Sequence, residues 1–374
     1  FGEEEPEDEA IDWQDPLLTF NTACFGCHVS QLSKNYDPEN NTYDTVWTEP
    51  GINCETCHGP GSEHIRVCVE APEGTVPEDL KIPLLKDITQ LQWDETCAPC
   101  HAKMTPLTSD FQPGDRYFDH FGLVTLEDRD FYPDGRDLGE NYTYTGWLMS
   151  PCVKNGDLGC LHCHTSSGRY RFKGETSDEA NRACLPCHQA RVKNATKHTR
   201  HPVDTPGNKC ISCHMPMTSF SHMRRSDHSL LPPTPAATMA FGSDNACNIC
   251  HSDKTPEWAD AIVRDWHAGH DYQAPVVARG KLVDEARKSN WKRLDEMLKI
   301  ISDDDRDEVF ATSMLRILAN CPDPAKWPTI RKALSDPSPL VRSAAATHLT
   351  ADLVPETVAL LLDATEDSYR IVRI

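Results

Sequence analysis

The pattern Cys-x-x-Cys-His occurs seven times between residues 24 and 251 of this 374-residue chain. Two cysteines at this spacing, followed at once by a histidine, are typical of the attachment of a c-type haem. The thiols bond one porphyrin, and the adjacent histidine lies under the iron as an axial ligand. Because the pattern uses 14 of the 17 cysteines, we predict seven covalently bound haems, around which the chain has to fold.

The predicted attachment residues are the two cysteines of each copy: Cys24, Cys27, Cys54, Cys57, Cys97, Cys100, Cys160, Cys163, Cys184, Cys187, Cys210, Cys213, Cys247 and Cys250. The predicted proximal iron ligands are His28, His58, His101, His164, His188, His214 and His251. A Cys-x-x-Cys pair alone also suits half of a zinc site or a redox disulfide. Neither alternative explains why a histidine follows every second cysteine.

Apolar residues make up only 38% of the sequence, a low share for a chain of this length to build a side-chain core. A porphyrin is a large apolar body, and its burial removes surface from water. The 28 prolines and 19 glycines favour turns and short helices between the motifs. We therefore predict a mainly α fold with much irregular structure, in which residues 1–254 form a haem-packed cytochrome c domain.

Acidic residues dominate the charge, with 58 Asp and Glu against 37 Lys and Arg, a net charge of −21. Such a surface disfavours nucleic acids and anionic lipids as partners. The acidic run from Glu3 to Glu9 fits a solvated tail. No apolar stretch of about 18 residues, the length that predicts a transmembrane helix, is present. Haems of this type are attached outside the cytoplasm, so we expect a mature periplasmic or extracellular chain whose leader has been removed.

Helical periodicity replaces the haem motifs after His251. Thr255 and Pro256 predict a helix start, with a capping hydroxyl followed by proline at the first position. We predict helices over 258–267, 275–288, 291–301, 306–319, 324–334, 339–349 and 355–363. Residues 255–374 are therefore predicted to form a second, all-α domain.

The helical region carries a weak internal repeat. The segment 336–342, Asp-Pro-Ser-Pro-Leu-Val-Arg, is similar to 367–373, Asp-Ser-Tyr-Arg-Ile-Val-Arg, and residues 302–309 form a fainter copy. An acidic turn followed by Val-Arg at a helix start resembles HEAT-type helical repeats. An ordinary helical bundle is the alternative. The repeat breaks off at Ile374, so we expect the natural protein to continue beyond it.

Three cysteines lie outside the motifs. Cys68 and Cys152 both fall in the haem region, and they are the predicted pair if a disulfide forms in an oxidising compartment. Cys321 falls in a helical pattern and is expected to be a small buried apolar group.

The second axial ligand decides whether an iron is closed, as suits electron transfer, or open to substrate. Ten histidines remain outside the proximal set, enough for seven irons. Sequence context favours five of them as distal ligands: His64, His120, His198, His201 and His228. The remaining irons are expected to take His222, His267 or His270, with Met215, Met217 and Met223 as methionine alternatives.

Other histidines are poorer candidates. His162 lies inside the fourth motif, where it cannot easily reach its own iron and could serve only a neighbouring one. His348 lies in a predicted helix far from any motif and is expected to be structural. No spare histidine lies between His28 and His58, so the first haem is the predicted unusual site.

The contexts of the motifs resemble a known family. The segment 54–64, Cys-Glu-Thr-Cys-His-Gly-Pro-Gly-Ser-Glu-His, resembles an element of multihaem cytochromes similar to the tetrahaem cytochrome c of ammonia oxidisers. The stretches 132–135, 210–216, 224–229 and 246–251 resemble larger relatives that carry a C-terminal helical-repeat region. The resemblance implies that His64 and His228 are distal ligands. It also implies a histidine where this chain has Ser167, which leaves the partner of one iron open.

These features predict an electron-transfer protein rather than an enzyme, in which electrons pass along closely spaced haems. The predicted partners are other redox proteins or further copies of the chain, stacked as an extracellular wire. The alternative is an oxidoreductase acting on a small nitrogen or sulfur compound at one open iron. No Cys-x-x-Cys-Lys variant, the form at the active haem of some nitrite reductases, occurs. A third hypothesis makes residues 255–374 a scaffold that docks a partner.

Overall fold

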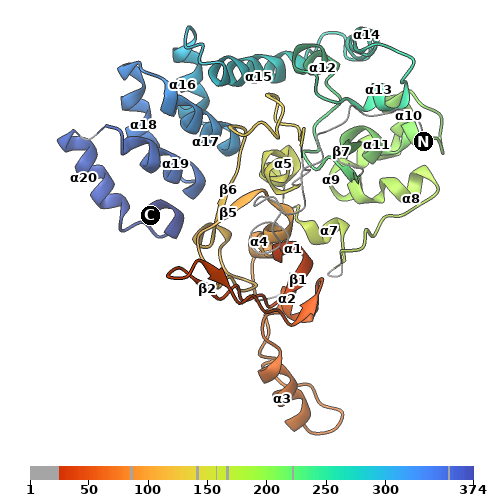
Figure 1. The fold of residues 1–374 in the computed structure, drawn as a ribbon. Helices are drawn as coiled ribbons and strands as arrows, with labels where there is room; N and C mark the ends of the chain where they lie inside the picture. Colours follow the sequence, from red (N-terminus) through yellow and green to blue (C-terminus); the bar gives the residue numbers. More distant parts are fainter. Residues whose placement is uncertain are drawn as a thin grey trace. The chain divides into compact units, whose positions relative to one another are not determined.

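The computed structural model describes residues 25–84, 87–139, 143–156, 158–165, 168–220, 223–352 and 354–374. Helices dominate these residues, and the described strands form four antiparallel pairs (Figure 1). Irregular segments connect the elements, especially between the haem motifs. The predicted fold class, mainly α with much irregular structure, is confirmed.

The chain divides into two units of packing. The first comprises Phe1–Cys100 and Thr108–Tyr117, and the second comprises His101–Leu107 and Phe118–Ile374. The domain boundary predicted at residue 254 follows a change in sequence type and stays a prediction.

The first unit is built from short elements. Motif helix α2 begins where the Asn53 side chain accepts a hydrogen bond from the backbone N–H of Thr56, as an N-cap does. Its helices are α1 (Phe25–His28), α2 (Cys54–His58), α3 (Ser62–Glu70) and α4 (Gln90–His101), whose last residue belongs to the second unit. Its strands are β1 (Val29–Ser30) paired with β4 (Glu49–Pro50), and β2 (Tyr36–Asp37) paired with β3 (Thr42–Tyr43).

The second unit starts with further haem motifs among short helices. Asn245 caps the seventh motif by accepting from the backbone of Cys247, and Asn181 accepts from Cys210 at the sixth. The paired strands are β5 (Met104–Pro106) with β6 (Phe121–Leu123), and β7 (Met217–Phe220) with β8 (Met223–Ser226). The helices are α5 (Thr143–Met149), α6 (Pro151–Asn155), α7 (Cys160–Cys163), α8 (Ser177–Asn181), α9 (Leu185–Lys193), α10 (Ala195–Thr199), α11 (Cys210–His214), α12 (Pro235–Phe241) and α13 (Ala246–Cys250). The 3-10 turns are Tyr117–Asp119, Arg182–Cys184 and Pro206–Asn208.

The remainder of the second unit is a succession of longer helices (Figure 1). All seven helices predicted after His251 are confirmed, with small shifts at their ends, and the Thr255 side chain caps the first of them. They are α14 (Pro256–Trp266), α15 (Gln273–Arg287), α16 (Leu294–Ser302), α17 (Glu308–Ile317), α18 (Trp327–Ala333), α19 (Pro339–Leu349) and α20 (Pro355–Ala364), followed by α21 (Arg370–Arg373). Two 3-10 turns, Leu318–Asn320 and Pro324–Lys326, lie between α17 and α18.

Arginine–aspartate pairs link successive copies of the internal repeat. Arg306 pairs with Asp336, which stands in the acidic turn of the next copy. Arg342 makes two hydrogen bonds, of 2.7 and 3.0 Å, to Asp367, the equivalent aspartate one copy further on. The similar sequence segments therefore occupy similar places in the helical stack.

Side-chain burial differs sharply between the motif helices and the repeat helices. Helices α2, α7, α9 and α11, which carry four of the motifs, have no buried residue. In α17 and α19, by contrast, eight of ten and eight of eleven residues are buried. The repeat region therefore has an ordinary side-chain core, whereas these four motif helices lack one.

The cysteines outside the motifs have separate surroundings. Cys68 and Cys152 are free thiols, so the predicted disulfide between them is wrong. The Cys68 Sγ atom lies 3.9 Å from His64 Nδ1, one helical turn earlier on α3, and Cys152 lies near Cys187 of the fifth motif. Cys321 is 3% exposed and is, as predicted, a buried apolar group.

In the part of the chain that the structure describes, we find no helix both long and apolar enough to span a membrane.

Candidate haem-binding sites

Three motif histidines face a second histidine in the second unit. The ring centres of His164 and His228 are 6.4 Å apart, and their planes are inclined by 28°. His214 and His198 have ring centres 6.3 Å apart and nearly parallel planes, inclined by 8°. The ring centres of His251 and His201 are 6.2 Å apart. Each pair joins one motif histidine to one of the five preferred distal candidates.

This separation suits a metal ion held between two imidazoles. A metal–imidazole bond is about 2 Å long. A five-membered ring with bonds of about 1.3 Å has its centre about 1.1 Å from each atom. Imidazoles on opposite sides of one metal ion therefore have ring centres about 6 Å apart, as all three pairs do.

The elements place these histidines at their ends. His164 follows α7, and His228 lies two residues after β8. His214 ends α11, and His198 lies in α10. Short helices that end at the motif thus present one imidazole of each pair, and a neighbouring element presents the other.

The pair at the seventh motif is formed by His251 and His201. His251 is the C-cap residue of α13, and His201 follows α10. Asn208 donates from Nδ2 to the His201 carbonyl at 3.0 Å. The rings of Trp266 and Trp258 contact His201 and His251 from α14. A buried asparagine and two half-buried tryptophans therefore contact this pair.

Backbone carbonyls orient several of the rings through Nδ1. His228 Nδ1 lies 2.8 Å from the Ser226 carbonyl, and His201 Nδ1 lies 2.6 Å from that of Thr199. A hydrogen bond from Nδ1–H fixes the tautomer and leaves the Nε2 lone pair free for a metal. In both cases the carbonyl belongs to the residue two positions earlier, a local contact that the sequence analysis missed although its spacing is visible.

His198 has a different neighbour. Its Nδ1 atom lies 3.3 Å from Nη1 of Arg191, which can only donate a hydrogen bond. Burial, followed by the charge of Arg191, lowers the pKa of His198. A neutral ring that accepts from Arg191 at Nδ1 carries its proton on Nε2, so ligation of a metal through Nε2 requires Arg191 to move away.

Burial also lowers the pKa of His214 and of His228. A neutral imidazole is the form that binds a metal. The backbone of Leu230 and Leu231 lies beside the His214 ring and partly opposes the effect of burial on its pKa. These rings are thus neutral at physiological pH and available as ligands.

Two histidines of the first unit are anchored in the same way through Nδ1. His58 Nδ1 lies 3.4 Å from the Pro83 carbonyl, and His64 Nδ1 lies 2.7 Å from that of Leu80. His58 also meets Trp93 edge to face. Both rings keep Nε2 directed away from the backbone, as a ligand of either role requires.

The other predicted ligands are placed as follows. His28 ends α1, His101 ends α4 within electrostatic reach of His164 and His228, and His188 is an exposed residue at a kink in α9. His120 is buried just before β6. Cys24, Ser167 and His222 lie outside the described residues.

The two poorer candidates have their own hydrogen bonds. His162 Nε2 lies 3.0 Å from the Ala183 carbonyl. His348 is 5% exposed, its Nδ1 lies 2.8 Å from the Leu315 carbonyl, and its ring meets Trp327 edge to face. These contacts account for both histidines without a metal.

The motif cysteines form a succession of neighbours. Burial raises the pKa of Cys57, and the neighbouring Cys97 adds to this effect. The second and third motifs are therefore neighbours. A hydrogen bond with Cys210 of the sixth motif, followed by burial, raises the pKa of Cys184 of the fifth. Cys163 of the fourth motif adds to this effect, so these three motifs are neighbours.

The seventh motif continues the same succession. Burial raises the pKa of Cys213 to about 11, and the neighbouring Cys247 and Cys250 of the seventh motif add to this effect. His101 and His164 likewise bring the third and fourth motifs within reach of one another. Within the second unit, the motifs from the fourth to the seventh are therefore neighbours in their sequence order.

A tyrosine stands among three of these motifs. Burial, followed by Cys163, Cys184 and Cys210, raises the pKa of Tyr170 to about 12. Its hydroxyl is buried without a hydrogen-bond partner in the described part of the chain. A buried hydroxyl of this kind suits a hydrogen bond to the carboxylates that a porphyrin carries. The histidine pairs, the free thiols and this hydroxyl together fit c-type haems.

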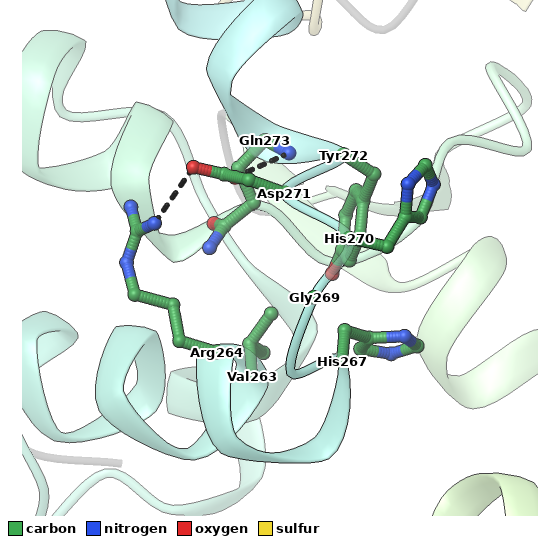
Figure 2. Close-up of a pocket in the computed structure, with 8 residues that line it drawn as sticks. All are labelled: Val263, Arg264, His267, Gly269, His270, Asp271, Tyr272 and Gln273. Carbon is green, nitrogen blue, oxygen red and sulfur yellow. Dashed lines mark hydrogen bonds and ion pairs between the residues drawn. The ribbon is translucent and has the colours of Figure 1, made fainter.

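A cavity of about 350 Å³ lies between α14 and α15 (Figure 2). His267 and His270 both line it, and the His267 ring meets Tyr272 edge to face. Arg264 donates to Asp271 at 2.8 Å along its wall. The structure thus brings two of the competing distal candidates to one cavity and pairs neither with a motif histidine.

Two family models match parts of the chain. Residues 3–59 match the model described as cytochrome c554 and c-prime, and residues 294–374 match HEAT repeats. The first match includes two haem motifs, and the second covers α16 to α21. The chain is therefore similar to cytochrome c554 at its N-terminal end and to HEAT repeats at its C-terminal end.

The HEAT match begins 39 residues after residue 255, the predicted start of the helical domain. No curated protein matches the sequence. Among solved structures, the outer cell wall cytochrome OcwA is similar, with 16% identity, a TM-score of 0.45, and coverage of 92% of this chain and 75% of that one.

Proposed function

We propose that the cytochrome carries electrons along seven covalently attached haems, most of them ligated by two histidines. The observation that carries this proposal is the set of three histidine pairs, His164–His228, His214–His198 and His251–His201, with ring centres 6.2 to 6.4 Å apart. Two strong ligands close an iron to substrate and keep its geometry similar in both oxidation states, as electron transfer requires.

The neighbouring motifs support a continuous route for electrons. Electron tunnelling falls steeply with distance, so the carriers have to lie close together. Cysteines of successive motifs are neighbours from the fourth motif through the fifth and sixth to the seventh. The proposed route therefore follows the order of the motifs along the chain.

The protein's own residues do three things in this proposal. The motif cysteines hold the porphyrins, the histidines ligate the irons, and backbone carbonyls such as those of Ser226 and Thr199 orient the ligating rings. When bound, the haems supply one-electron redox chemistry. The surrounding protein tunes the reduction potential of each haem through burial and through fixed charges such as Arg191.

Location and partners are also part of the proposal. Attachment of c-type haem places the cytochrome in the periplasm or outside the cell. Its net charge of −21 disfavours nucleic acid. Its proposed partners are other redox proteins or further copies of itself, assembled as a wire.

Two measurements test the proposal. Intact-mass analysis of the mature protein is expected to show seven covalent haems, and the ferric spectrum is expected to be low-spin for nearly all irons. A missing mass increment would contradict the seven sites. A large high-spin component that binds cyanide or nitric oxide would instead favour the alternative, an oxidoreductase at an open iron, with the first haem at His28 as its predicted location.

A further inference from the structure

A buried arginine ties together two of the proposed haem sites. Arg136 is 6% exposed, and its Nη1 atom donates to Asp134 Oδ2 at 2.7 Å. Its Nη2 atom donates to the Pro232 carbonyl at 2.9 Å, 96 residues further along the chain. Its Nε atom lies 3.7 Å from Asp227 Oδ2. The guanidinium therefore contacts the segment 227–232 at both of its ends, near Asp227 and at Pro232.

That segment serves two histidine pairs. It carries His228, the partner of His164 at the fourth motif. The backbone of its Leu230 and Leu231 lies beside the ring of His214 at the sixth motif. A movement of this one segment would thus disturb both sites.

The segment needs an external hold, because it has no helix or strand of its own after β8. Leu230 has φ of 54°, a left-handed conformation that a leucine rarely adopts. Such conformations persist only where the surroundings determine them. Near β8 the hold comes from the Asp227 N–H, which donates to the Pro216 carbonyl at 2.9 Å, and at the far end it comes from Arg136.

The arginine itself is fixed by its own loop. Phe131 and Asp137 form a bridge, and the Tyr132 N–H donates to the Arg136 carbonyl at 2.8 Å. Gly135 has φ of 98°, and a Cβ atom there would lie 3.0 Å from Met149 Sδ. Ser243 donates to the same oxygen of Asp134 that accepts from Arg136. The loop therefore presents Arg136 in one position.

We propose that Arg136 is a positioning residue for two haem sites, since it fixes the segment that aligns His228 with His164 and that lies beside His214. The inference rests on the proposed function, because it assumes that both pairs ligate iron. The role requires two donors in one rigid plane, one for Asp134 and one for the Pro232 carbonyl. Lysine at position 136 would keep the charge but could not make both contacts in this geometry.

The test compares variants of the mature full-length protein after the haem content of each has been measured by mass. In Arg136→Gln we expect a high-spin signal and carbon monoxide binding from the fourth haem, together with a shifted midpoint potential of the sixth. Arg136→Lys is expected to show both changes more weakly. His228→Ala should open the fourth iron alone, with the sixth potential unchanged.

Arg342→Gln is the matched control, because it removes an arginine that makes a similar two-pronged contact to Asp367 in the repeat region. It should leave every haem signal unchanged. A fully loaded Arg136→Gln protein with the wild-type spin state and potentials overturns the inference. If that variant loses haem, Arg136→Lys and Asp134→Asn decide, and wild-type signals in both overturn it. A wild-type protein without low-spin, doubly ligated haem would instead refute the proposed function itself.

Discussion

At the scale of single residues, the orientation of each imidazole decides what a histidine can do. His201 shows how closely this orientation is fixed: its Nδ1 atom lies 2.6 Å from the Thr199 carbonyl, and Gly207 packs against the opposite edge of the ring. A Cβ atom on Gly207 would lie 2.3 Å from His201 Cδ2. Only glycine leaves room for the ring where it faces His251.

Gly207→Ala is therefore expected to push His201 away from His251 and to open the seventh iron. The fully loaded variant should show a high-spin ferric signal and bind carbon monoxide when reduced. Gly122→Ala is the control, because a Cβ atom there would make only ordinary contacts, at 3.8 Å to the Thr105 carbonyl and 3.9 Å to Ile371. A low-spin spectrum in Gly207→Ala identical to that of the wild type would contradict the expected displacement.

His348 gives a pH-dependent prediction in the repeat region. Burial lowers its pKa to about 4 from an ordinary value near 6.5. The unfolded chain then binds more protons than the folded one between pH 4 and pH 6.5, so stability falls as the pH drops through this window. We expect a loss of about 3 kcal/mol at pH 4 relative to pH 7.

Hydrogen exchange in α17 and α19, corrected for the intrinsic pH dependence of exchange, measures this loss. In His348→Gln the two helices should be equally protected at both pH values, apart from the contributions of other groups. An unchanged pH dependence in that variant would exclude His348 as its source.

At the scale of elements, the repeat helices are locked to one another by charged pairs between copies. Arg342 and Asp367 are 13% and 15% exposed in their side chains, so water screens their attraction only in part. Arg342 also donates to the carbonyls of Asp336 and Pro337 at the start of α19. One side chain thus joins two acidic turns.

Arg342→Gln is expected to destabilise the repeat region by about 1–3 kcal/mol, because it leaves Asp367 partly buried without its ion pair. Urea titration followed by tryptophan fluorescence of the region, which contains Trp327, measures this change. Arg373→Gln is a milder comparison, since Arg373 donates an exposed hydrogen bond to the backbone carbonyl of Asp367 rather than to its carboxylate. Equal losses in the two variants would contradict the importance of the ion pair.

The elements also show which structural predictions were within reach of the sequence. The helices from α14 to α20 follow apolar periodicity and capping residues such as Thr255, and both signals are local. The disulfide between Cys68 and Cys152 was a wrong prediction, because pairing of distant cysteines depends on tertiary proximity. Ordinary local signals thus sufficed for helices but not for long-range contacts.

At the scale of the whole molecule, the two parts of the chain obtain their stability differently. Helices α17 and α19 bury most of their side chains against neighbours, whereas α2, α7, α9 and α11 bury none. Burial of apolar surface is the main favourable contribution to folding. These four motif helices are therefore expected to obtain it from the porphyrins.

A chain produced without haem attachment is accordingly expected to leave the motif region unfolded while α15 to α19 stay folded. Limited proteolysis with fragment mass analysis should recover a resistant fragment from the C-terminal helices and rapid cleavage between residues 150 and 250. The haem-loaded protein, treated in parallel, should resist cleavage in both regions. Equal resistance of the motif region with and without haem would contradict the view that porphyrins form its core.

The sequence by itself determined the seven motifs, the set of histidines from which the distal ligands are drawn, and the helical repeats, because each of these depends on short spacings along the chain. Only the tertiary structure decided that His228 faces His164, that His198 faces His214, and that His201 faces His251. It also revealed Arg136, whose contact with Pro232 joins residues 96 positions apart. Ligand pairing depends on which distant segments pack together, and no local spacing records that choice.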